Sequence, residues 1–243
     1  MRIVAIVQAR MGSTRLPCKV MRDIAGEPML GRVLQRLKHC RYISQLVVAT
    51  TKDSSDDCIV DYCNAHSVGV YRGSMEDVLD RYWHASQEFH ADVVVRITSD
   101  CPLIDPEITD KTIQEFLDVG PDYASNTLVR SYPRGLDTEV VSSRVLFRCW
   151  QNANLAYQRS HVTAYIYEHP ESFRLHAVKD EGDCSGQRWT VDTAEDLEFV
   201  RAVYSNFIGR EDFNWIDVLE LLGQHPELAD LNRHVLQKTL HEG

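Results

Sequence analysis

Apolar strands alternate with helical segments along the first half of the chain, and this alternation constrains the fold more than any other feature. Runs rich in β-branched and other apolar residues predict strands at 3–7, 45–50, 68–71 and 92–98. The segments between and after them predict helices at 28–37, 54–66, 76–89 and 106–119. Strand–helix alternation of this kind predicts a mainly parallel sheet with helices on both faces.

The second half of the chain has a less regular pattern. Short strands are predicted at 122–125, 137–142, 173–178 and 188–191. Helices are predicted at 143–155, 160–168 and 193–207, followed by two short helices within 213–240 that break at Pro226. The chain has 243 residues with no internal repeat and no low-complexity linker, and it therefore predicts one α/β domain over 1–243.

A basic loop follows the first strand, at the edge where open α/β sheets bind ligands. This loop, residues 9–19, has no acid and contains Gly12, two hydroxyls and three cations, Arg10, Arg15 and Lys19. Residues 1–41 carry a formal charge of +7, whereas the rest of the chain carries −17. Exposed backbone amides and fixed cations suit a polyphosphate, so a local anionic ligand is predicted. A solvated surface loop is the alternative interpretation.

Composition excludes several classes of partner and location. An isoelectric point near 5.4 argues against broad binding of nucleic acid or of anionic membranes. No run of about 18 apolar residues predicts a transmembrane helix, and the first apolar run is too short for a secretory signal. Seven cysteines without a C-x-x-C pair are typical of reduced thiols. These features predict a cytoplasmic protein.

Two motifs resemble those of a known family. Residues 9–19, A-R-M-G-S-T-R-L-P-C-K, resemble the nucleotide-binding loop of the sugar cytidylyltransferases, which activate ulosonic and nonulosonic acids with CTP. Residues 72–82, R-G-S-M-E-D-V-L-D-R-Y, resemble the SpsF-like branch, named for spore-coat polysaccharide synthesis. Cys18 stands where most members have glycine. The resemblance covers most of residues 1–205.

The resemblance implies a fold and a division of labour along the chain. The fold is a Rossmann-like three-layer α/β/α nucleotide-diphospho-sugar transferase fold with a mainly parallel mixed sheet. The nucleotide-binding half is expected at about 1–120, and an acceptor-binding and dimerisation part at about 121–190. C-terminal helices are expected at about 193–243.

The resemblance also implies roles for particular side chains. Arg10 and Lys19 are the expected catalytic cations. Asp100 in D-C-P-L-I and Asp192 in V-D-T-A-E-D-L are the expected carboxylate ligands of Mg²⁺. The expected nucleotide-binding residues are Ala9, Arg10, Gly12, Ser13, Arg15, Lys19, Arg72 and Ser74. Because an arginine fork suits a sugar carboxylate, the expected acceptor-binding residues are Arg134, Arg159 and His161.

Several of these residues have a local structural explanation as well. Asp100 could cap the following turn, and Ser74 could cap the following helix. Asp192 followed by Glu195 is a helix-start pattern that predicts Asp192 as the N-cap. A cap and a metal ligand are compatible, because each carboxylate oxygen can serve one of them. An isolated arginine or histidine is most often a surface or capping residue.

The reaction implied by the resemblance is nucleotidyl transfer. A hydroxyl of an acidic sugar attacks the α-phosphorus of CTP and pyrophosphate leaves, with Mg²⁺ as the cofactor and a homodimer as the expected assembly. The acceptor is left open among neuraminic, legionaminic, pseudaminic and 3-deoxy-octulosonic acids, a phosphonate and a polyol phosphate.

Other functions are disfavoured by missing motifs. The chain lacks the D-x-D typical of nucleotide-sugar-dependent glycosyltransferases. It also lacks G-x-G-x-x-G and the P-loop pattern, which disfavours a dinucleotide-dependent oxidoreductase and a P-loop kinase. A glycosyltransferase and a non-catalytic sugar- or nucleotide-binding protein remain as alternatives.

Overall fold

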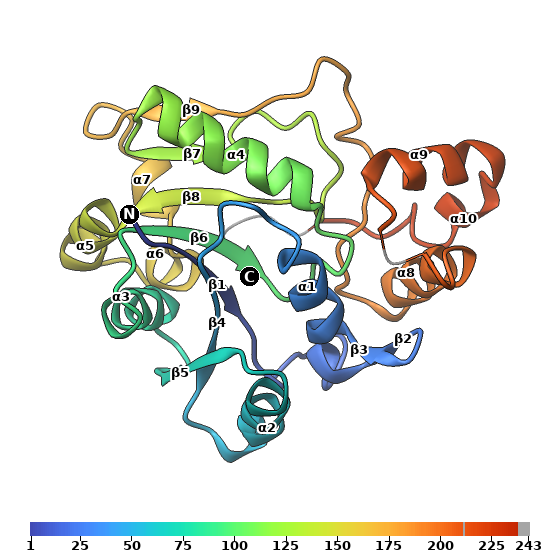
Figure 1. Cartoon of the computed structure of the whole chain (residues 1–243), viewed down its shortest axis with the longest axis horizontal. Coiled ribbons are helices and arrows are strands. Elements are labelled where there is room, and N and C mark those ends of the chain that lie inside the picture. The colour runs from blue at the N-terminus through green and yellow to red at the C-terminus, as the bar shows by residue number, and fades with distance from the viewer. Residues whose placement is uncertain (211, 238–243) are drawn as a thin grey trace.

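A seven-stranded sheet crosses the centre of the computed structural model, which describes residues 1–210 and 212–237 (Figure 1). In spatial order its strands are β5 (Gly69–Gly73), β4 (Gln45–Thr51), β1 (Ile3–Gln8), β6 (Val93–Thr98), β8 (Glu139–Ser142), β7 (Tyr123–Ser125) and β9 (Leu175–Ala177). All pairs are parallel except β8 with β6 and with β7. The expected mainly parallel mixed sheet is therefore confirmed.

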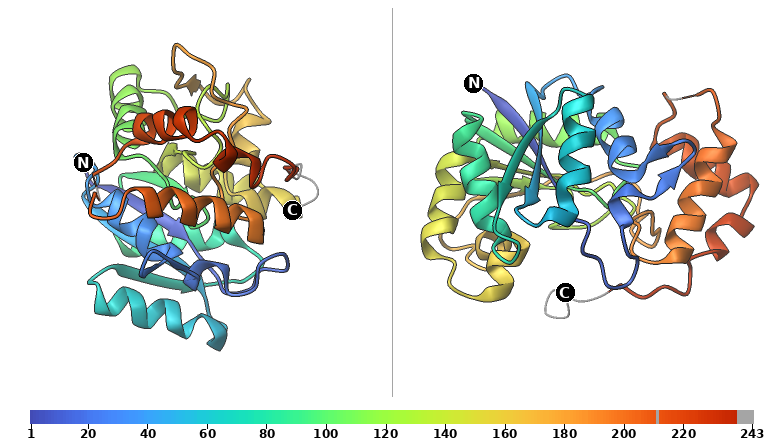
Figure 2. Two further views of the ribbon diagram at one scale, coloured as in Figure 1. Left: turned by 90° about the vertical axis from the view of Figure 1, so that its right-hand side faces the viewer. Right: turned by 90° about the horizontal axis from the view of Figure 1, so that it is seen from below.

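Helices cover both faces of this sheet and complete three layers (Figure 2). The helices that pack on the first face are α1 (Met29–Leu37), α2 (Asp57–Ala65) and α4 (Pro106–Val119). The same core continues at one end of the sheet into α8 (Ala194–Asn206) and α9 (Trp215–Gln224). The helices that pack on the second face are α3 (Val78–Glu88), α5 (Ser143–Asn152) and α7 (Ala164–Tyr167). Strands from residues 1–120 and from 121–190 share the one sheet.

Both faces of the central strand are buried, which explains its continuous apolar sequence. Ala5 and Val7 of β1 join the core on the first face, whereas Val4 and Ile6 join the core on the second. All four side chains are fully buried because successive residues of a strand point to opposite faces. Burial of each larger side chain contributes about 1.5–3 kcal/mol.

Two predicted elements differ from the structure. The expected helix at 160–168 is instead two short helices, α6 (Ala156–His161) and α7, separated by Val162 with φ of 60°. A β-branched residue in the left-handed region cannot continue a helix. The expected strand at 188–191 is wrong, because only a single bridge joins Arg188 to Arg134. A neighbouring amide, that of Val191, donates instead to the carbonyl of Asp100.

Small elements between β1 and α1 were not predicted. They are a short 3₁₀ turn, η1 (Lys19–Met21), and a hairpin of β2 (Asp23–Ile24) with β3 (Glu27–Pro28). A second 3₁₀ turn, η2 (Ser54–Asp56), forms the first turn of the helix predicted at 54–66 and leads into α2. These elements are two or three residues long, which is too short for a periodic apolar pattern to reveal.

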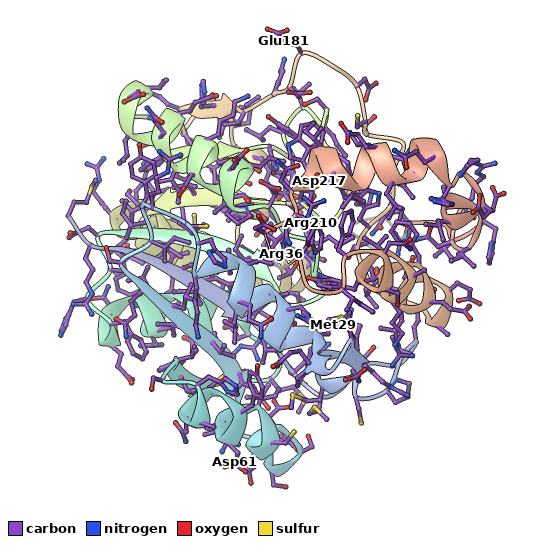
Figure 3. The ribbon with its side chains drawn as sticks, turned by 45° about the vertical axis from the view of Figure 1, so that its right-hand side comes forward. Met29, Arg36, Asp61, Glu181, Arg210 and Asp217 are labelled. Carbon is purple, nitrogen blue, oxygen red and sulfur yellow. The ribbon has the colours of Figure 1, made fainter. Side chains whose placement is uncertain are left out.

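The C-terminal helices dock at one end of the sheet through the side chain of Arg36. This arginine donates to the carbonyl oxygens of Ile104, at 2.5 Å, and Phe213, at 3.0 Å. Figure 3 shows Arg36 on α1 together with Arg210, and the two residues line one cavity. The chain breaks at Pro226 between α9 and α10 (Glu227–Asp230), as predicted, and the end of the predicted range, 238–240, lies outside the described residues.

None of the helices in the described ranges has the length and apolar character that a membrane crossing requires.

Candidate active site

The parallel pairing of β1 with β6 brings two predicted segments to the same edge of the sheet. Gln8, at the end of β1, pairs with Thr98, at the end of β6. The basic loop 9–19 leaves β1 at this edge, and Asp100 follows β6 there. Because carboxyl ends of neighbouring parallel strands coincide, residues about 90 positions apart in sequence meet at one site.

Lys19 joins the two carboxylates that the sequence nominates as metal ligands. Its Nζ donates to Asp100 Oδ2 at 3.2 Å and to Asp192 Oδ1 at 3.0 Å. Arg15 approaches the same oxygen of Asp192, with Nη2 at 3.1 Å. The Lys19 side chain is only 13% exposed, so these ion pairs are largely shielded from solvent. Four of the predicted site residues therefore form one charged cluster.

The ionisation of this cluster is set by competition between burial and opposite charge. Burial would lower the pKa of the Lys19 ammonium, but the charges of Asp100 and Asp192 outweigh it and raise that pKa above its ordinary value. Burial would raise the pKa of Asp100, yet the charge of Lys19 and hydrogen bonds to the carboxylate lower it overall. Lys19 and Asp100 are therefore both charged at neutral pH.

Asp192 is not the N-cap of the following helix, which corrects the predicted helix start. The cap is Thr193, whose hydroxyl accepts from the amide of Asp196 at 3.3 Å. In return the carboxylate of Asp196 accepts from the amides of Thr193, at 3.1 Å, and Asp192, at 2.9 Å. The capping box is thus shifted by one residue, which leaves the carboxylate of Asp192 for Lys19 and Arg15.

A buried ion pair below the site holds Asp192 in place, and its members were not predicted as site residues. Arg188 Nη2 donates to Asp192 Oδ2 at 3.1 Å, and Arg188 Nε donates to Asp196 Oδ1 at 2.9 Å. Asp196 is fully buried and also accepts from Asn232 Nδ2 at 3.0 Å. The sequence T-A-E-D could have revealed the capping box of Thr193 with Asp196, since these two residues also have capping-box spacing.

A second buried carboxylate positions the start of the basic loop. Asp56 is 1% exposed and accepts from the amide of Met11 at 2.7 Å and from the amide of Thr51 at 3.1 Å. The hydroxyl of Thr50 also donates to it, at 3.1 Å. Asp56 therefore ties the loop to the carboxyl end of β4.

Cys18 has the backbone conformation that the family's glycine would favour, with φ of 57° and ψ of 26°. We expect Cys18→Gly to raise the free energy of unfolding by about 1 kcal/mol, because glycine adopts left-handed dihedrals without a Cβ penalty. Chemical denaturation would measure the change. The matched control is Cys58→Gly at the start of α2, where glycine should destabilise the helix. A loss of stability in Cys18→Gly would contradict the prediction.

Two clefts open at this edge of the sheet. The first, here named the loop cleft, has a volume of about 370 Å³ and is lined by Arg10, Gly12, Ser13 and other residues of the basic loop, including Ala9. The second, here named the arginine cleft, has a volume of about 640 Å³ and is lined by Arg96, Arg130 and Arg134. Both are bordered by the same four residues, Thr98, Asp100, His161 and Asp192.

The three arginines of the arginine cleft differ in whether they are paired. Arg96 is ion-paired with Glu139. Both terminal nitrogens of Arg130 donate hydrogen bonds to the carboxylate of Asp137, at 2.6 and 2.8 Å. The guanidinium of Arg134 makes no hydrogen bond or ion pair within the described ranges 1–210 and 212–237. Burial and the nearby positive charge of Arg130 lower the pKa of Arg134. The charge of Asp137 acts on Arg134 in the opposite sense, but among the three arginines of this cleft Arg134 is the one that makes no direct contact with an acid in the described ranges.

Three other predicted residues lie outside the linings of both clefts. Arg72 donates to the carbonyls of Thr51 and Asp53, both at 2.8 Å, and pairs with Asp57 at 2.6 Å. The hydroxyl of Ser74 accepts from the amide of Asp77, and Arg159 donates to the carboxylate of that same aspartate at 2.6 Å. The side chains of Arg72, Ser74 and Arg159 are thus engaged by the protein itself, and their roles in binding a ligand stay predictions.

A mainly parallel sheet with a basic loop at its carboxyl edge, a carboxylate pair beside that loop and two adjoining clefts define an α/β protein with its candidate ligand site at that edge. Comparisons with known proteins identify its family. The family model described as cytidylyltransferase matches residues 4–212. The chain belongs to the cytidylyltransferase family, in its SpsF-like branch, as the motifs predict.

Individual relatives agree with this placement. The chain is 34% identical to the spore coat polysaccharide biosynthesis protein SpsF of Bacillus subtilis, over 93% of this chain and 96% of that protein. It is 36% identical to an uncharacterized protein of Methanocaldococcus jannaschii over 100% and 99% of the two chains. A cytidylyltransferase structure from Leptospira borgpetersenii superposes with a TM-score of 0.91 at 32% identity, covering 98% of this chain and 100% of that one.

Proposed function

We propose that this protein transfers CMP from CTP to an acidic sugar, an ulosonic or nonulosonic acid, with release of pyrophosphate. The observation that carries the proposal is the Lys19–Asp100–Asp192 cluster, which lies where the loop cleft and the arginine cleft meet. A transferase must bring two substrates together at one set of reacting groups. The two clefts provide one volume for each substrate on either side of that cluster.

The reaction forms one bond and breaks one bond at the α-phosphorus. The sugar hydroxyl attacks in line, the bond to the bridging oxygen of the β-phosphate breaks, and pyrophosphate leaves with that electron pair. Negative charge grows on the phosphate oxygens and on the leaving group. Arg10 and Lys19 would stabilise this charge, while Arg15 and Ser13 would hold the phosphates. Positioning and electrostatics account for most of the catalysis in such a step.

The residues at the cluster fit a magnesium ion. Mg²⁺ is held by one or two carboxylates together with substrate phosphates, and Asp100 and Asp192 are two carboxylates close enough to share one ammonium group. When bound, Mg²⁺ would neutralise part of the triphosphate charge. The contact of both carboxylates with Lys19 Nζ supports a site that favours positive charge.

The acceptor side supports an acidic sugar through Arg134. A substrate carboxylate is a natural partner for a guanidinium that makes no direct contact with an acid of the protein, since the planar fork matches that group. His161 borders both clefts and is placed to contact either substrate. A relative supports a sugar substrate: 48% of this chain aligns at 35% identity with 46% of a 3-deoxy-manno-octulosonate cytidylyltransferase of Trichlorobacter lovleyi. Homodimer formation and a cytoplasmic location are proposed with this function.

A ligand-binding experiment tests the proposal without knowledge of the acceptor. The unfolding temperature is measured with CTP, UTP, ATP, GTP, UDP-sugars and NADH, each with and without Mg²⁺. CTP at about 100 times its dissociation constant should stabilise the fold by about 2.7 kcal/mol. Release of pyrophosphate across a panel of acidic sugars then identifies the acceptor.

The outcomes separate the competing functions. A shift selective for CTP that depends on Mg²⁺, and that is lost in Asp100→Ala, is the expected result. A preferential shift with a UDP-sugar would favour a glycosyltransferase instead. CTP binding without pyrophosphate release across the acceptor panel would favour a binding protein.

A further inference from the structure

The C-terminal segment 231–237 returns to the candidate active site after α10. It lies beyond residues 4–212, the part of the chain that the family model matches. Gln237, the last residue that the structure describes, lines the arginine cleft together with Arg134 and Asp192. A residue from outside the region that the family model matches therefore borders the cleft in which the acceptor is proposed to bind.

Asn232 anchors this segment to the buried ion pair below the site. Its side chain is buried, and Nδ2 donates to the carbonyl oxygen of Arg188 at 2.9 Å and to Asp196 Oδ1 at 3.0 Å. The amide of Val235 then donates to the carbonyl of Asn232 at 2.9 Å, which turns the chain. The segment is therefore tied to the same arginine that holds Asp192.

Gln237 contacts that arginine beside the cleft. Arg188 Nη1 donates to Gln237 Oε1 at 2.5 Å, while Nη2 of the same guanidinium donates to Asp192 Oδ2 at 3.1 Å. Because a guanidinium can only donate, the oxygen of the Gln237 amide faces it, and the nitrogen is the end of the side chain that donates. Gln237 is exposed, so a ligand in the arginine cleft can reach this side chain.

A neutral amide complements the charges of the arginine cleft. Arg134 is the proposed partner of the sugar carboxylate, but an ulosonic or nonulosonic acid also carries several hydroxyl groups. A hydroxyl oxygen can accept a hydrogen bond from an amide nitrogen without any change in charge. Because a polar group of the site that a wrong substrate leaves unpaired costs free energy, such a contact also discriminates among acceptors.

We propose that Gln237 donates a hydrogen bond from its amide nitrogen to a hydroxyl of the acidic sugar in the arginine cleft. The proposal rests on the proposed function, because that sugar is the second substrate of the proposed reaction. Arg188 links this contact to the reacting groups, since one of its terminal nitrogens holds the oxygen of Gln237 and the other holds Asp192. The C-terminal segment therefore completes the acceptor site and fixes it relative to Asp192.

Two substitutions at Gln237 separate its donor from its contact with Arg188. Gln237→Met removes both, whereas Gln237→Glu keeps an oxygen for Arg188 and loses the donor. Rates of pyrophosphate release are measured with CTP, Mg²⁺ and neuraminic, legionaminic, pseudaminic or 3-deoxy-octulosonic acid, and the sugar that the wild type converts fastest is used. We expect the KM for that sugar to rise about three- to tenfold in both variants, the effect of one hydrogen bond. The KM for CTP and kcat should change less than about twofold, because the contact binds the acceptor alone.

The matched control is Gln224→Met at the end of α9. Gln224 is also an exposed glutamine of the C-terminal region, but it lines neither cleft. Its kinetic constants should equal those of the wild type. The unfolding temperatures of all three variants should stay near that of the wild type, because both glutamines are exposed.

The pattern of results decides the role of Gln237. A raised sugar KM in Gln237→Met but not in Gln237→Glu would show that the residue acts only through Arg188, and would overturn the proposal. A raised sugar KM in Gln237→Glu alone would indicate repulsion by the added charge, and would overturn it as well. An unchanged sugar KM in both variants would exclude the contact. A wild-type protein that converts none of the four sugars is a separate result, which would overturn the proposed function on which this inference rests.

Discussion

Lys19→Met is expected to lower kcat by about 10²–10³-fold, because a positioned cation that meets developing charge contributes an effect of that size. The fold should persist, since Arg15 and Arg188 still contact Asp192 after the ammonium is removed. Initial rates of pyrophosphate release at saturating CTP measure the loss, and circular dichroism measures the fold.

The matched control for this substitution is Lys38→Met. It removes one positive charge from the same cationic region, residues 1–41, but Lys38 is exposed at the end of α1 and lines neither cleft. Its kcat should equal that of the wild type. Near-full turnover in Lys19→Met would remove Lys19 from the mechanism, and an equal loss in both variants would show that only the overall charge of the segment matters.

Asp196→Ala is expected to lower the free energy of unfolding by about 3–5 kcal/mol, the range for removing one partner of a buried ion pair. Asp196 is fully buried and holds Arg188, two backbone amides and Asn232. After truncation the guanidinium of Arg188, whose side chain is 10% exposed, keeps only the contact with Asp192 among its carboxylate partners in the described ranges. Urea denaturation of both proteins measures the difference.

Asp217→Ala is the control, because Asp217 occupies the same capping-box position at the start of α9. Its side chain is 26% exposed and its arginine partner, Arg210, is 55% exposed, so the ion pair adds little. We expect a loss of about 1 kcal/mol, as for a helix cap alone. Equal losses in the two variants would show that the buried pair adds nothing beyond capping.

The effect of Asp196 depends on pH in a defined direction. Burial would raise the pKa of its carboxyl, but hydrogen bonds and the charge of Arg188 lower it overall. Its stabilising contribution is therefore complete above the unfolded value of about 4 and is lost as pH falls toward the lower folded value. The stability difference between wild type and Asp196→Ala should shrink below about pH 4, and a difference that grows there would contradict this assignment.

Burial explains why the first half of the fold could be predicted from sequence. Strands such as β1 are covered on both faces, so each shows an uninterrupted apolar run between helical segments. The proximity of loop 9–19 to Asp100 was predictable because both follow neighbouring parallel strands, whereas Asp192 follows no strand and was nominated by the family motif alone. The irregular segments around 160–168 and 188–191 were predicted wrongly, since distant residues hold them: Thr163 donates to Glu139, and the amide of Val191 donates to the carbonyl of Asp100.

The sequence by itself determined the family, the mainly parallel sheet and the cationic loop, because local apolar patterns and contiguous motifs carry that information. Only the tertiary structure decided which arginines are paired. Arg72 and Arg159 are ion-paired with Asp57 and Asp77. In the described ranges, by contrast, two nitrogens of the buried Arg81 have no hydrogen-bond partner, and the guanidinium of Arg134 makes no direct contact with an acid. A sequence does not show whether an arginine is paired, because its availability to a ligand depends on which carboxylates the fold brings to it from elsewhere in the chain.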